Sequence, residues 1–60
     1  MAELFVNWVT RSNKVKVIGR PMEPDELVDF VLECTKEYGP GNFELFETAK
    51  IARLYADRRR

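Results

Sequence analysis

The chain has 60 residues, ten basic and ten acidic side chains, no histidine and one cysteine, so its formal net charge is zero. This length predicts one small domain, because so short a chain buries only about 60% of the surface that its unfolded form exposes. Without histidine, and with Cys34 as the sole thiol, the composition excludes an internal disulfide and histidine-dependent catalytic or metal sites, so we expect no enzyme activity, no metal and no cofactor.

Two strand-like runs at the start of the chain predict a β-hairpin. Residues 4–10 are mainly β-branched and aromatic, and residues 14–18 alternate polar and apolar side chains. The polar segment 11–13 between them consists of residues that favour turns. Gly19 and Pro21 are then expected to end the second strand, because proline cannot donate to a strand ladder.

The alternation of side chains along each strand predicts which residues share a face. Leu4, Val6 and Trp8 are expected on one face of the first strand. Val15 and Val17 are expected on one face of the second strand, with Lys14 and Lys16 on the other.

A helix is predicted from about residue 24 to residue 38. Pro24 suits the first helical position, and Asp25 and Glu26 place negative charge beside the positive end of the helix dipole. Gly39 has the conformational freedom to end the helix. The apolar stripe that identifies this helix comprises Leu27, Phe30, Val31, Cys34 and Tyr38, and is widened by Val28 and Leu32.

The last third of the chain has two interpretations. Residues 43–47 begin as a strand rich in aromatic side chains, and residues 49–56 would extend it, with a bend near Thr48. Alternatively, residues 43–56 form one helix capped by Asn42. The helical alternative is supported by plentiful alanine, with Leu45, Ala49, Ala52 and Ala56 as a narrow stripe. We favour the strand, because a third strand gives the preceding helix a broader surface to cover.

The predicted fold is therefore α+β: a small antiparallel sheet, made of the hairpin and one or two C-terminal strands, covered by one helix in the order ββαβ(β). Residues 1–57 would form the single domain, and residues 58–60 a basic tail. One helix covers only one face of a sheet, so the other face would be exposed. The residues expected to line that face are Phe5, Val9, Phe46 and Tyr55.

The chain is expected to be cytoplasmic. No apolar run approaches the roughly 20 residues that cross a bilayer. Residues 1–4 have neither the basic start nor the apolar stretch of a signal peptide. The low cysteine content is typical of proteins in a reducing compartment.

The net charge of zero is the sum of three consecutive blocks whose net charges alternate in sign. Residues 1–20 have a net charge of +3, residues 21–47 of −7, and residues 48–60 of +4. Such asymmetry concerns surface fields and partners rather than the fold. It favours a charged partner for this chain.

Binding to another protein is the predicted function, because seven aromatic residues exceed what so small a core can hide. The expected partner-binding residues lie on the sheet and on the acidic face of the helix: Trp8, Lys14, Lys16, Arg53 and Tyr55, and Asp29, Glu33 and Glu37. One alternative is a nucleic-acid-binding protein that uses the basic hairpin and the arginines of residues 58–60, provided that the acidic helix lies on the far face. Another alternative is a homodimeric structural domain.

The order of these elements resembles that of the small phage-encoded ββαβ inhibitors of host enzymes such as bacterial RNA polymerase. The matching features are the hairpin over residues 4–18, the helix start at residues 24–27, the glycine stop and the aromatic strand at residues 43–45. This resemblance implies a non-enzymatic regulator or inhibitor that acts by docking on a larger host protein. The extension beyond Ala49 and the arginine tail depart from the ββαβ plan.

Overall fold

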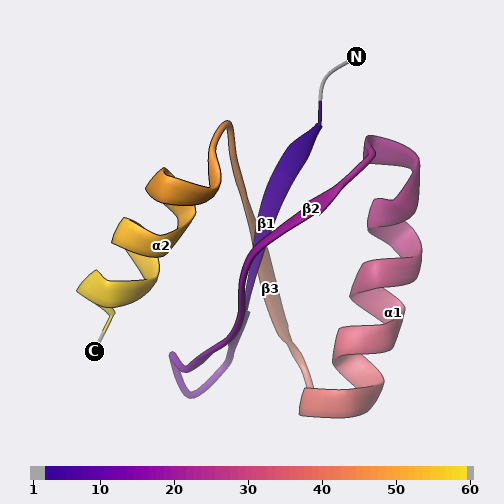
Figure 1. Cartoon of the computed structure of the whole chain (residues 1–60). Helices are drawn as coiled ribbons and strands as arrows, with labels where there is room; N and C mark the ends of the chain where they lie inside the picture. The colour runs from indigo at the N-terminus through magenta and orange to yellow at the C-terminus, as the bar shows by residue number, and fades with distance from the viewer. Residues whose placement is uncertain (1–2, 60) are drawn as a thin grey trace.

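Figure 1 shows the computed structural model, which describes residues 3–59 as a three-stranded antiparallel sheet with one helix on each face. The strand order across the sheet is β2-β1-β3, so β1 is central and the other two strands form the edges. A short 3-10 turn at Pro24–Glu26 precedes the first helix. The elements in chain order are β1 (Leu4–Thr10), β2 (Val15–Met22), α1 (Leu27–Tyr38), β3 (Gly41–Phe46) and α2 (Ala49–Arg58). The predicted α+β class and antiparallel sheet are confirmed.

Strand β1 is buried on both faces, because it is central and a helix covers it from each side. Val6 and Trp8 point toward α1, where the Trp8 ring meets the Phe30 ring edge-on with centroids 6.1 Å apart. Asn7 and Val9 point toward α2 and are also buried. The core on the α1 side contains Val6, Trp8, Met22, Phe30 and Cys34, with Val17, Leu27 and Val31 packed against it.

Residues 49–58 form a helix, so the strand favoured for residues 49–56 is wrong. The helical alternative is confirmed for these residues but not for residues 43–46, which belong to β3, and the cap is Thr48 instead of Asn42. The helix begins after Thr48, whose hydroxyl accepts a hydrogen bond from the backbone N–H of Ile51 at 3.2 Å. Ala52 and Ala56 are buried against the sheet, and their small side chains let the helix approach it closely. The expectation of one open sheet face is therefore wrong, because α2 covers that face (Figure 1).

Strand β2 continues past the point at which it was expected to end. Gly19 adopts a positive φ of 61° and Pro21 still pairs with Phe5 on β1. The register shifts by one residue between the pairs of Val6 and Trp8, so Gly19 accommodates an irregularity instead of ending the strand. Proline is tolerated here because β2 is an edge strand.

A second register shift places Val15 and Val17 on opposite faces of the sheet, so the expectation that they share a face is wrong. Trp8 pairs with Val17, and the next residue, Val9, pairs with Val15, so Lys16 is an extra residue in the ladder. Val17 consequently packs into the core under α1, whereas Val15 lies on the α2 side near Ala56.

The folded structure extends past the domain boundary expected at residue 57. Arg58 is the last residue of α2, and Arg59 contacts both Asn13 and Glu44. Arg60, the last residue of the expected tail, lies outside the described residues. So do Met1 and Ala2, which belong to the segment that was expected to lack the features of a signal peptide. Neither helix in residues 3–59 is long and apolar enough to cross a membrane.

Candidate interface beside strand β3

The structure separates the predicted partner-binding residues into four locations. Trp8 is 1% exposed and belongs to the core, so it does not contribute to a surface. Lys14 and Lys16 are exposed on the hairpin. The remaining residues are also exposed, on opposite sides of the sheet: Asp29, Glu33 and Glu37 on α1, and Arg53 and Tyr55 on α2.

The acidic residues of α1 follow the flank of the helix that lies over β2. Glu33 and Glu37 line a shallow hollow there together with Arg20, whose guanidinium lies 5.7 Å from the centre of the Phe30 ring. Burial raises the pKa of the Cys34 thiol at the base of this flank, Arg20 opposes the rise, and Glu33 and Glu37 add to it. Cys34 is therefore a protonated core residue at neutral pH and not a reactive thiol.

The opposite flank of α1 carries an apolar groove. Its volume is about 310 Å³, and its lining is wholly apolar. Val28 and Leu32, which were expected to widen the core stripe, are instead 69% and 65% exposed. The lining residues are Leu27, Val28, Val31 and Leu32 from α1 and Phe43 from β3.

The apolar surface continues from the groove along β3. Phe43 and Leu45 pair with Trp8 and Val6, so both side chains lie on the α1 face of the sheet. They are 39% and 44% exposed, because α1 covers this part of the sheet incompletely. We call the combined surface of the groove and the α1 face of β3 the β3 interface.

The two edges of the sheet differ in how well they are protected from pairing. The β2 edge has two register shifts and contains Lys16, Gly19 and Pro21, all of which obstruct the addition of another strand. Strand β3 pairs with β1 in an unbroken register from Gly41 to Phe46 and contains neither proline nor lysine. Within residues 3–59 no strand pairs with its outer edge.

The one charge on β3 is directed away from the β3 interface. Glu44 pairs with Asn7 and so lies on the α2 face, where its carboxylate forms an ion pair with Arg59. Arg59 also donates a hydrogen bond to the side-chain oxygen of Asn13 at 2.7 Å. This network leaves the α1 face of β3 without charge.

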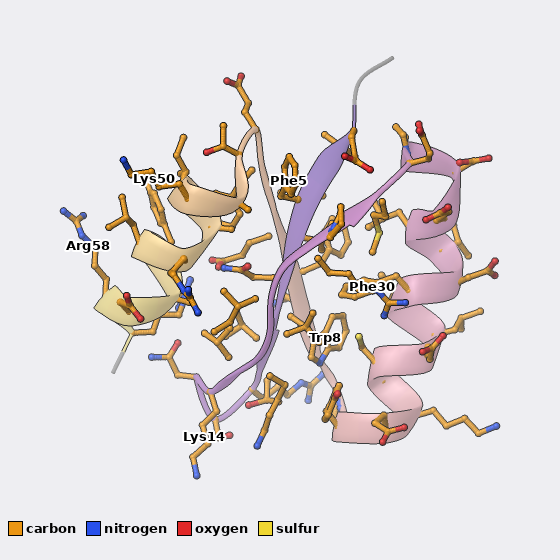
Figure 2. The ribbon with its side chains drawn as sticks, viewed as in Figure 1. Phe5, Trp8, Lys14, Phe30, Lys50 and Arg58 are labelled. Atoms are coloured by element: carbon orange, nitrogen blue, oxygen red, sulfur yellow. The ribbon has the colours of Figure 1, made fainter. Side chains whose placement is uncertain are left out.

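The α2 side of the molecule is basic. Figure 2 shows Lys50 and Arg58 on the side of the sheet away from Phe30, and Lys14 at the tip of the hairpin. Tyr55 packs against Phe46 with ring centroids 5.1 Å apart. A hollow of about 450 Å³ lies between the hairpin and the end of α2, with Lys14 and Arg59 in its lining.

Sequence reasoning did not identify Val28 and Leu32 as surface residues. The available signal was their place at one side of the helical stripe, away from Phe30 and Cys34 at its centre. Comparison of the chain with protein-family models, with curated proteins and with solved structures finds no match to any of them.

Proposed function

We propose that the chain is a small, non-enzymatic protein-binding module that accepts an extended protein segment along the outer edge of β3. The single observation that carries this proposal is the wholly apolar groove directly beside an unprotected sheet edge. Large apolar side chains exposed together typically mark an interaction site. Such a module regulates or inhibits its partner by docking on it.

The bound segment would form a fourth strand. Backbone groups on the free edge of β3 would hydrogen-bond to it, and the groove would select its side chains. Because side chains alternate along a strand, every second residue of the segment would point toward Val28 and Leu32. The preferred segment therefore has apolar residues at alternate positions.

The charged surfaces would guide the encounter with the partner. Asp29, Glu33 and Glu37 on α1 and Arg53 on α2 stay exposed when β3 is covered, because they do not line the groove. Charges at the rim of an interface mainly affect the association rate and specificity. The predicted contact residues on the helices would thus have a secondary role.

Site-specific photo-cross-linking in the cell that naturally makes the chain tests this proposal. Leu32→p-benzoylphenylalanine places the reactive group in the groove, and Leu54→p-benzoylphenylalanine places it at a leucine that is 54% exposed on the opposite side. We expect a protein adduct at position 32 that is lost when Leu45→Lys adds a charge beside the groove.

The comparison of adducts at positions 32 and 54 decides the outcome. An adduct that forms at position 32, is absent at position 54 and disappears with Leu45→Lys supports the proposal, whatever the identity of the partner. Equal adducts at both positions, or no adduct at position 32, would exclude the β3 interface as a binding site.

Nucleic-acid binding is a second candidate, favoured by the placement of the helices on opposite faces. The basic residues Lys50, Arg53 and Arg58 lie on α2, and the acidic helix α1 lies across the sheet, where it does not oppose an approaching phosphate backbone (Figure 2). Arg59, however, is engaged by Glu44 and Asn13. The basic α2 surface, rather than the whole arginine tail, would contact the phosphates.

Fluorescence anisotropy with labelled DNA and RNA tests this second candidate. We expect affinity that falls steeply between 20 and 200 mM salt, on the order of what counterion release predicts. Charge reversal with Lys50→Glu and Arg53→Glu should abolish the binding, while Lys36→Glu on α1 should leave it unchanged. Absence of binding at the lowest salt concentration would eliminate nucleic acid as a ligand.

A further inference from the structure

We infer that the segment bound at the β3 interface is strand β3 of a second copy of this chain. Two three-stranded sheets would then join into one six-stranded antiparallel sheet with the β3 strands at its centre. This inference rests on the proposed function, because it names the occupant of the same surface.

Strand β3 has the side-chain pattern that the groove requires. Phe43 and Leu45 both lie on the α1 face, two residues apart, and are more than one-third exposed. The groove that would receive them offers only apolar surface from α1 and from Phe43. The sheet edge and the strand that fits it are therefore the same element, which makes the surface complementary to itself.

A two-fold axis perpendicular to the sheet satisfies both the backbone and the side chains. It makes the two β3 strands antiparallel and keeps both α1 helices on one face of the joined sheet. If the axis passes at Glu44, Phe43 of each copy lies opposite Leu45 of the other. Val28 and Leu32 of both helices then border one shared apolar strip.

The charges permit this contact. Glu44 near the axis lies on the α2 face and is paired with Arg59 of its own chain. Glu33 and Glu37 lie on the β2 flank of α1, away from the groove. The contact therefore brings no unpaired like charges together at its centre.

The contact would also cover the most exposed large apolar side chains of the described residues, those of Val28 and Leu32. Eight hydrophobic residues among residues 3–59 are buried, and Val28 and Leu32 are not among them. A second copy therefore supplies the apolar burial that the isolated chain lacks on this side. The groove has no charged or polar lining, so it makes no electrostatic demand that the apolar α1 face of β3 from a second copy would fail to meet.

Sedimentation equilibrium on the full chain, from micromolar to millimolar concentration, tests the inference. We expect the mass to rise from 7.1 kDa toward twice that value. Leu32→Glu should weaken the dimer by about a hundredfold, because the change enters a symmetric interface twice at roughly tenfold each. Leu54→Glu, the same substitution on α2, should leave the dimer unchanged, and far-ultraviolet circular dichroism should confirm that both variants fold.

Contacts between copies locate the interface. In a sample that mixes isotope-labelled and unlabelled chains, filtered nuclear Overhauser spectra should connect the Phe43 ring of one copy to the Leu45 methyl groups of the other. A dimer that withstands Leu32→Glu, or that lacks this contact, overturns the inference.

A chain that stays monomeric at millimolar concentration also overturns the inference. In that case the photo-cross-linking at position 32 decides the proposed function separately. An adduct with a different protein retains the β3 interface as a binding site, and no adduct removes both proposals.

Discussion

Asn7 is the residue whose loss should most directly separate α2 from the sheet. Its side chain is fully buried on the central strand and makes two hydrogen bonds to different elements. The amide nitrogen donates to the backbone oxygen of Ala52 in α2 at 2.9 Å. The amide oxygen accepts from the backbone N–H of Gly19, at the irregularity in β2, at 2.7 Å. Asn7 thus joins three elements from inside the core.

Asn7→Ala should lower the free energy of unfolding by about 3 kcal/mol. The two hydrogen bonds contribute about 1 kcal/mol each, and the partly buried N–H of Gly19, left without a partner, costs about 1 kcal/mol or more. The whole domain is expected to have a stability of roughly 3–9 kcal/mol, from the usual value per residue. The substitution should therefore remove a large share of that stability.

Urea unfolding at low protein concentration, followed by the fluorescence of Trp8, measures this loss. Trp8 is the only tryptophan and is buried in the native state, so its emission reports unfolding directly. Asn42→Ala, the same change at an exposed position of β3, is the control and should cost less than about 0.5 kcal/mol. If Asn7→Ala is unfolded in water, both variants are compared in a stabilising osmolyte. A loss below about 1 kcal/mol at Asn7 would refute this account of its role.

Three further changes test other contacts by the same unfolding assay. Thr48→Ala should cost about 1 kcal/mol by removing the cap on the N–H of Ile51, while a cost near zero would contradict the cap. A double-mutant cycle on Arg59→Ala and Glu44→Gln should give a coupling of about 1 kcal/mol that shrinks in high salt, and an additive result would show no interaction. Burial raises the pKa of Cys34 in the folded state, so the free energy of unfolding should keep its full value below about pH 8.5 and fall as pH rises through the folded pKa. Cys34→Ala should remove this pH dependence. If the pH dependence persists in that variant, another group causes it.

Local sequence signals were sufficient for the hairpin and for α1. The run of β-branched residues in β1 is interpreted correctly because it acts over a few neighbouring residues. The segment Pro24–Glu26 was expected to be the first turn of the helix and instead forms a short 3-10 turn directly before α1, which begins at Leu27. Gly39 ends α1 as expected, with a positive φ of 93°. These features depend little on the rest of the fold.

Long-range packing decided the elements that were predicted wrongly. Residues 49–58 are helical because Ala52 and Ala56 allow a helix to lie close to a sheet face that would otherwise be exposed. The continuation of β2 through Gly19 depends on the hydrogen bond from its N–H to Asn7, twelve residues earlier. The hydrogen bond to Asn7 has no signature in the local sequence, whereas the alanine pattern was visible there but did not by itself favour a helix over a strand.

The β3 interface was hidden for a related reason. An amphipathic stripe indicates which side of a helix faces the core, but the rotation of the helix about its axis decides which flank is covered. In α1 this rotation buries Phe30 and Cys34 and leaves Val28 and Leu32 exposed. The charge pattern, by contrast, follows the fold: the acidic residues Asp29, Glu33 and Glu37 lie on α1, and the basic residues Lys50, Arg53 and Arg58 lie on α2.

The difference between the two sheet edges limits how far an assembly of this chain can grow. A protein with two regular open edges can act as a template at both ends and polymerise into a fibre. Here the irregular β2 edge, with Pro21 and its two register shifts, is a poor template. A chain that has used β3 therefore offers no second regular edge within residues 3–59, and growth by strand addition stops after one step.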